Sequence, residues 1–183
     1  MNKLKTRASN FTKKALIIVI LLLALTNSGL SQEKDFTFSC RNAIYLNFTT
    51  RGALYSINYD RIFYETDKIA YSYRLGFSVL EDVIAAPAGI NLFVRKGNFH
   101  PELSLTLMPY VDKYKSFMSD NDLSDKYLYV IPGIGYRYQK PSGGFFAKAL
   151  ISPMVVLDPP SSNFWKMDPK LYPAASIGLG YSF

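Results

Sequence analysis

Beyond residue 40, apolar and polar side chains alternate with a period of two residues in a series of short segments. In the segment 69–79, the odd positions are apolar or aromatic, and the even positions are small or polar with one Arg. The segments 99–109 and 175–183 repeat this arrangement. Because successive side chains of a strand point to opposite faces, the alternation predicts strands with one apolar and one polar face.

Eight segments of this kind can be placed between residue 42 and the end of the chain. Their boundaries are predicted to within a few residues, as is usual for strands placed from a pattern. The segments cover residues 42–50, 53–64, 68–79, 86–95, 98–109, 127–139, 144–156 and 173–183.

The composition of the polar face indicates which side of the sheet faces solvent. A soluble sandwich or a lipocalin-like barrel would also alternate, but it would bury its apolar face and carry many Lys and Glu outside. Here the polar face is rich in Gly, Ser and Ala, and its charges are few and of both signs. We therefore predict an all-β fold, an eight-stranded antiparallel up-and-down transmembrane β-barrel with its apolar face outside.

The lengths of the connections support the membrane barrel. The second, fourth and sixth connections are predicted to be tight turns at 65–67, 96–97 and 140–143, and the third, fifth and seventh to be longer loops. Short periplasmic turns that alternate with long extracellular loops are typical of outer-membrane barrels. The first connection, at 51–52, is predicted to be tight and departs from this rule. The even number of strands places both termini in the periplasm.

Aromatic residues gather near both ends of the predicted strands, where membrane barrels carry interfacial girdles. The expected girdle at the turn side comprises Tyr59, Phe63, Tyr71, Phe99, Tyr136, Tyr138, Phe145, Tyr181 and Phe183. The expected girdle at the loop side comprises Phe48, Tyr55, Tyr110, Phe164, Trp165 and Tyr172.

The first thirty residues have the parts of a secretory signal peptide. A basic stretch precedes the unbroken apolar run 15–25, and small polar residues follow it. An uncleaved anchor is the alternative, but eleven apolar residues form only about 16 Å of helix against a membrane core of about 30 Å. We predict a signal peptide at 1–31, a periplasmic N-terminal segment at 32–41 and the barrel at 42–183.

Removal of the signal peptide changes the charge balance. The chain has 21 basic and 14 acidic residues, and five of the basic ones lie in the predicted signal. The remaining balance is nearly neutral, so we expect no nucleic-acid partner. The single Cys40 has no partner for an internal disulfide. It is separated from the apolar run by charged residues, which argues against lipidation.

Five charged residues are expected inside the barrel. They are Asp60, Arg74, Glu102, Arg137 and Lys148. An eight-stranded barrel is about filled by its own side chains, and buried charges must be paired, so we predict a cluster of ion pairs in the lumen. The cluster is interpreted as a sealed, rigid wall; the alternative is a gate for ions or small solutes.

The strand patterns resemble a family of small outer-membrane β-barrel proteins common in Bacteroidetes. The matching stretches are 54–61, 87–91, 134–139 and 177–183, each a degenerate barrel-strand pattern. The terminal Phe183, with Tyr181 and Leu179 on the same face, resembles the strand that the barrel-assembly machinery recognises. The resemblance implies the fold and a location in the outer membrane, with lipid and lipopolysaccharide around the barrel. It implies no activity, and an extracellular partner stays unknown.

No catalytic, metal or cofactor site is predicted. The single His100 lies beside a tight turn, away from the loop side where lipid A-modifying barrels hold their active site. The loop that carries Asp120, Asp122 and Asp125 lacks the glycine and the closing Glu of a calcium-binding loop. Two function classes remain: a structural or interaction protein that acts through its extracellular loops, and a narrow channel or apolar-ligand binder.

Overall fold

The computed structural model describes residues 37–113, 125–157 and 170–183. No helix in these ranges is long and apolar enough to cross a membrane. The signal peptide predicted at 1–31 lies outside the described residues. The described strands are β1 (Asn42–Thr49), β2 (Tyr55–Glu65), β3 (Ile69–Leu80), β4 (Val83–Ala85), β5 (Ala88–Val94), β6 (Phe99–Asp112), β7 (Asp125–Gln139), β8 (Gly144–Leu157) and β9 (Lys170–Ser182).

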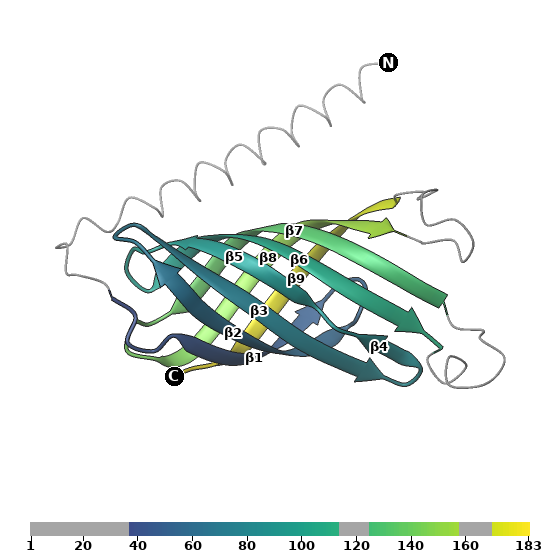
Figure 1. Ribbon diagram of the computed structural model, residues 1–183, viewed down its shortest axis with the longest axis horizontal. Coiled ribbons are helices and arrows are strands. Elements are labelled where there is room, and N and C mark those ends of the chain that lie inside the picture. Colours follow the sequence, from purple (N-terminus) through teal and green to yellow (C-terminus); the bar gives the residue numbers. More distant parts are fainter. Residues whose placement is uncertain (1–36, 114–124, 158–169) are drawn as a thin grey trace, which may run out of the picture. The chain divides into compact units, whose positions relative to one another are not determined.

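The strands form one closed antiparallel sheet (Figure 1). The sheet closes where β1 pairs with β9, with Ile44 opposite Tyr181 and Phe48 opposite Ile177. The short strand β4 and strand β5 together fill one position between β3 and β6. The barrel therefore has eight strand positions, in the order β1, β2, β3, β4/β5, β6, β7, β8, β9. The predicted eight-stranded antiparallel barrel is confirmed.

The fourth strand position departs from the prediction of one strand at 86–95. It begins earlier, at Val83, and is interrupted at Ala86 and Pro87. Proline has no N–H to donate, so the ladder lacks one bond at Pro87, while Gly76 N still donates to Pro87 O and Ala86 N to Pro109 O. Ladder pairing also extends to Leu80 opposite Val83, which leaves a turn of only Glu81 and Asp82. The prediction of a longer third connection was wrong.

The first connection spans residues 50–54 instead of the predicted 51–52. Its ends are joined by a hydrogen bond from Thr49 N to Leu54 O at 3.0 Å. The Thr49 hydroxyl donates to this segment as well, with Ala53 O at 2.7 Å. Gly52 has a φ of 75°, a conformation that side-chain-bearing residues rarely adopt. The connection is therefore a compact loop that needs its glycine.

We name the two ends of the barrel by their connections. The turn end holds the turns 66–68, 95–98 and 140–143, and the loop end holds 50–54, 81–82 and the connections from β6 to β7 and from β8 to β9. The connection from β6 to β7 comprises residues 113–124, of which residue 113 is described. The connection from β8 to β9 comprises residues 158–169, which lie outside the described ranges. Phe183 lies at the turn end, where it exchanges backbone hydrogen bonds with Asn42.

The exterior of the barrel is apolar and the interior is largely polar. In β3, Arg74 and Ser72 are buried, whereas Leu75 and Phe77 are more than half exposed. The same alternation holds along β6 and along the end of β9. The facing predicted for 69–79, 99–109 and 175–183 is confirmed. Among the described residues, buried polar side chains outnumber buried hydrophobic ones, the reverse of a soluble core.

A β-bulge interrupts this alternation near the turn end of β2. The register with β3 shifts between Ile62 and Tyr64, so that Phe63 is the additional residue. Phe63 and Tyr64 both lie exposed on the outer surface, and both rings contact Tyr71. The bulge adds one aromatic side chain to the outer surface at the turn end.

Residues 37–41 pack into the turn end of the barrel. The Phe38 ring is 2% exposed and lies 5.8 Å from the ring of Phe93 and 5.5 Å from that of His100. The backbone N–H groups of Ser39 and Cys40 both donate to Pro141 O. This part of the predicted periplasmic segment 32–41 therefore belongs to the barrel and covers its opening.

Candidate functional site

The charged lumen is the candidate site, and the five predicted residues come from five different strands. Asp60 lies on β2, Arg74 on β3, Glu102 on β6, Arg137 on β7 and Lys148 on β8. All five point inward, because they occupy the inward positions of alternating strands, and all five are buried. The structure brings four of them into one network and leaves Arg74 outside it.

The ion pair between Arg137 and Asp60 joins opposite walls of the barrel. Arg137 Nη2 donates to Asp60 Oδ2 at 2.9 Å, and Nη1 donates to Oδ1 at 3.0 Å. The pairing is bidentate, the geometry in which a guanidinium holds a carboxylate most firmly. Strands β2 and β7 lie four positions apart in a closed sheet of eight, so they stand opposite each other. This ion pair therefore crosses the full width of the lumen.

Glu102 connects the two remaining cations. Its Oε2 accepts from Arg137 Nε at 2.7 Å, and its Oε1 accepts from Lys148 Nζ at 2.6 Å. Arg137 and Lys148 stand directly opposite in the β7–β8 register, where like charges repel. Glu102 lies between them and offsets that repulsion. The four residues carry two positive and two negative charges, so the network is balanced.

Neutral side chains complete the network. The Asn91 side-chain amide donates to Asp60 Oδ2 at 2.9 Å and to Ser72 Oγ at 3.0 Å, and Gln139 Oε1 accepts from Arg137 Nη1 at 3.2 Å. The guanidinium carbon of Arg137 lies 4.3 Å from the ring centroid of Phe93, within the range of a cation–π contact. These four residues were not predicted as members of the cluster. Their inward positions in alternating strands were the available signal.

Arg74 occupies a different part of the lumen. It stands opposite Asp60 in the β2–β3 register, but both Asp60 oxygens are taken by Arg137. Its Nη2 donates to Thr106 Oγ1 at 2.6 Å. None of the ion pairs within the described ranges includes Arg74. The predicted cluster of five is therefore a network of four and a separate arginine.

His100 does not form a catalytic arrangement. Its ring is fully buried at the turn end, with Nδ1 2.9 Å from Val94 O and Nε2 3.0 Å from Gln139 O. Both ring nitrogens are therefore engaged by backbone carbonyl oxygens and not by a serine or carboxylate side chain. Across the part of the chain that the structure describes, no group of three or more His, Cys, Asp and Glu side chains is placed to hold a metal ion.

The residues of the predicted assembly signal lie on the outside of the last strand. Leu179, Tyr181 and Phe183 are all about half exposed or more. Leu179 and Tyr181 stand opposite Leu46 and Ile44 of β1, at the seam that closes the barrel. Their recognition by the assembly machinery stays a prediction. Phe164 and Trp165 of the predicted loop-side girdle lie outside the described residues.

Comparison with protein-family models and with curated protein sequences finds no match. Among solved structures, the chain is similar to the N-terminal β-barrel domain of Pseudomonas aeruginosa OprF. The two share 16% sequence identity at a TM-score of 0.48, over 78% of this chain and 96% of that chain.

Proposed function

We propose that this chain is a sealed barrel of the outer membrane with a structural or interaction role, and that it is neither an enzyme nor a diffusion channel. The apolar exterior supports the membrane location. Ile134, Ile151 and Ile177 on neighbouring strands are each more than half exposed, and water would disfavour such a continuous apolar surface. Outer-membrane lipid and lipopolysaccharide are the surroundings that fit it. In this proposal the barrel belongs with the small Bacteroidetes-type outer-membrane proteins that its strands resemble.

The observation that carries the sealed state is the ion pair that crosses the lumen. Arg137 reaches Asp60 on the opposite wall, and Glu102 ties Lys148 into the same layer. The Phe38 ring adds a second, apolar layer towards the turn end. A solute that passed through would have to break charge-assisted hydrogen bonds and displace a buried ring. A wall explains these two layers better than a pore does.

The proposed orientation places the turn end in the periplasm and the loop end outside the cell. The connections from β6 to β7 and from β8 to β9 are the longest and lie at the loop end, where outer-membrane barrels usually face outward, although the tight turn 81–82 lies there as well. Both ends of the barrel domain then lie in the periplasm, where Leu179, Tyr181 and Phe183 would meet the assembly machinery. A sealed wall leaves the extracellular connections as the parts able to contact a partner.

Electrical recordings test the sealed state. The purified full-length protein in planar phospholipid bilayers is expected to give no sustained conductance above that of the lipid, because the network crosses the whole lumen. The Glu102→Ala variant tests whether the network is the seal, and Arg61→Ala, which removes an exposed charge on the outer face, is the matched control. Sustained conductance of the unmodified protein that Glu102→Ala raises and Arg61→Ala leaves unchanged would contradict the wall and favour the narrow channel.

A further inference from the structure

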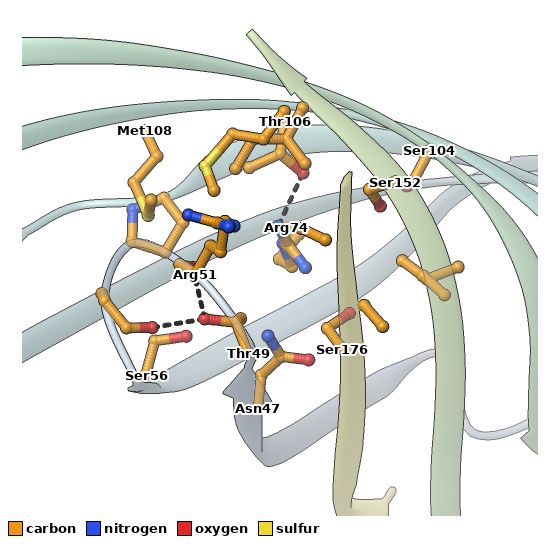
Figure 2. Close-up of a pocket in the computed structure, with 17 residues that line it drawn as sticks. Asn47, Thr49, Arg51, Ser56, Arg74, Ser104, Thr106, Met108, Ser152 and Ser176 are labelled. Carbon is orange, nitrogen blue, oxygen red and sulfur yellow. Dashed lines mark hydrogen bonds between the residues drawn. The ribbon is translucent and has the colours of Figure 1, made fainter. Parts of the chain in front are cut away.

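A small cavity lies in the loop-end half of the lumen, apart from the ion-pair network. Its volume is about 40 Å³, and side chains from most of the strands contribute to its lining. Figure 2 shows Arg74 and Arg51 reaching this cavity among several hydroxyl-bearing side chains. No Asp or Glu belongs to the residues that the structure describes around it. The cavity is therefore a polar space with positive charge and no opposing carboxylate.

Arg74 is the buried charge of this cavity. Arg74 is 6% exposed, and its Nε has no hydrogen-bond partner among the described residues. Within the described ranges, its side chain donates one hydrogen bond, to Thr106 Oγ1, a neutral acceptor. A buried guanidinium with no ionic partner is costly, because the charge has lost its water and gained no opposite charge. The described part of the chain supplies no negative group to this guanidinium.

The buried charges of the described part also include one more positive than negative side chain. The buried ionisable Asp, Glu, Lys and Arg side chains of the described part are Asp60 and Glu102 against Arg74, Arg137 and Lys148. The two carboxylates are fully used by Arg137 and Lys148. One positive charge remains, and it is Arg74. The exposed Arg51 adds a second positive charge at the same cavity.

We propose that this cavity binds a small monovalent anion, such as chloride, against the guanidinium of Arg74. A space that holds one water must have about 10–15 Å³, so a cavity of about 40 Å³ has room for a halide. The anion approaches from the loop end, because the ion-pair network closes the other side. The site is independent of whether the barrel conducts.

The lining supplies hydroxyl donors that complete such a site. Thr106 accepts from Arg74 through its oxygen, which leaves its own O–H proton to donate. Ser104, Ser152 and Ser176 also line the cavity, and a hydroxyl rotates to donate to an anion. Asn47 adds an amide whose Oδ1 has no partner in the described part of the chain, and the Nδ2 of the same amide carries two donor protons. A guanidinium surrounded by such donors is a chemistry that selects anions.

Bromide tests the site directly, because it replaces chloride and can be located by its anomalous scattering. Crystals of the full-length protein grown in sodium bromide are expected to show an anomalous peak in contact with Arg74, and crystals of the Arg74→Met variant to lack it. A peak that persists in Arg74→Met, or no peak at the unmodified Arg74, would overturn the proposal.

A solution measurement covers the case in which Arg74→Met does not crystallise. When chloride replaces gluconate at constant ionic strength, the unfolding temperature of the unmodified protein is expected to rise, because a ligand that binds the folded state stabilises it. Chloride affinity in Arg74→Met is expected to fall about tenfold or more. Arg61→Met, which removes a charge from the outer face, should keep the full dependence. No chloride dependence of the unmodified protein, or an equal dependence in Arg74→Met, would contradict the site.

Discussion

Replacing Arg137 with Met is expected to lower the free energy of unfolding by about 3–5 kcal/mol, the usual cost of removing one partner of a buried ion pair. The arginine is fully buried and holds Asp60 by two hydrogen bonds and Glu102 by one. Without it, the Asn91 amide is the hydrogen-bond donor that remains to the buried Asp60 carboxylate among the described side chains. Titration with urea of the protein folded in phospholipid vesicles, followed by the folded fraction on gels, measures the loss.

A second substitution separates the electrostatic cause from a loss of packing. In the double variant Asp60→Asn, Arg137→Met, a neutral amide replaces the unpaired Asp60 carboxylate, and Glu102 keeps its partner Lys148. We expect the double variant to be more stable than Arg137→Met alone, since a neutral group costs less to bury than an unpaired charge. Arg61→Met, at an exposed position on the outer face, is the control and should change little. A double variant that is less stable than the single one would contradict the pairing.

Replacing Ile151 with Lys is expected to destabilise the barrel by about 2–4 kcal/mol in a lipid bilayer. Ile151 lies near the middle of β8 and is 71% exposed on the outer surface. Its neighbours on the adjacent strands are Ile134 and Ala175, so the surface around it is apolar. A lysine there must bring its ammonium group into the hydrocarbon or distort the bilayer to reach water. The same urea titration in vesicles measures the change.

The matched control places the same charge on the same face of the same strand. Ala147 lies four residues nearer the turn end and also points outward. Because the cost of a charge falls towards the membrane interface, Ala147→Lys is expected to cost only about 0–1 kcal/mol. Equal effects of the two substitutions, or no effect of Ile151→Lys, would mean that this surface is not covered by lipid.

The facing of the side chains could be predicted because strand geometry dictates it. A period of two residues sends Leu75 outward and Arg74 inward whatever the strands around them do. The eight-stranded barrel was predicted from the number of alternating segments and from the composition of their polar face. The interruption at Pro87 was visible as a proline within a predicted strand, but the additional pairing of Leu80 with Val83 depends on the neighbouring strands and not on the local pattern.

The partners within the lumen could not be predicted in the same way. Asp60 and Arg74 are direct neighbours across β2 and β3, which favours a pair between them. In the structure, Asp60 instead pairs with Arg137 from the opposite wall. That choice depends on the width of the closed barrel and on the length of the arginine side chain. The burial of Phe38 likewise depends on the opening at the turn end, which exists only once the barrel has closed.

The most direct test of a sealed barrel in the outer membrane is the electrophoretic mobility of the full-length protein from fractionated cells, with and without boiling. A closed membrane barrel keeps its fold in dodecyl sulfate until it is heated, so we expect a band in the outer-membrane fraction that changes mobility on boiling. A band in the soluble periplasmic fraction whose mobility is the same before and after boiling would contradict it.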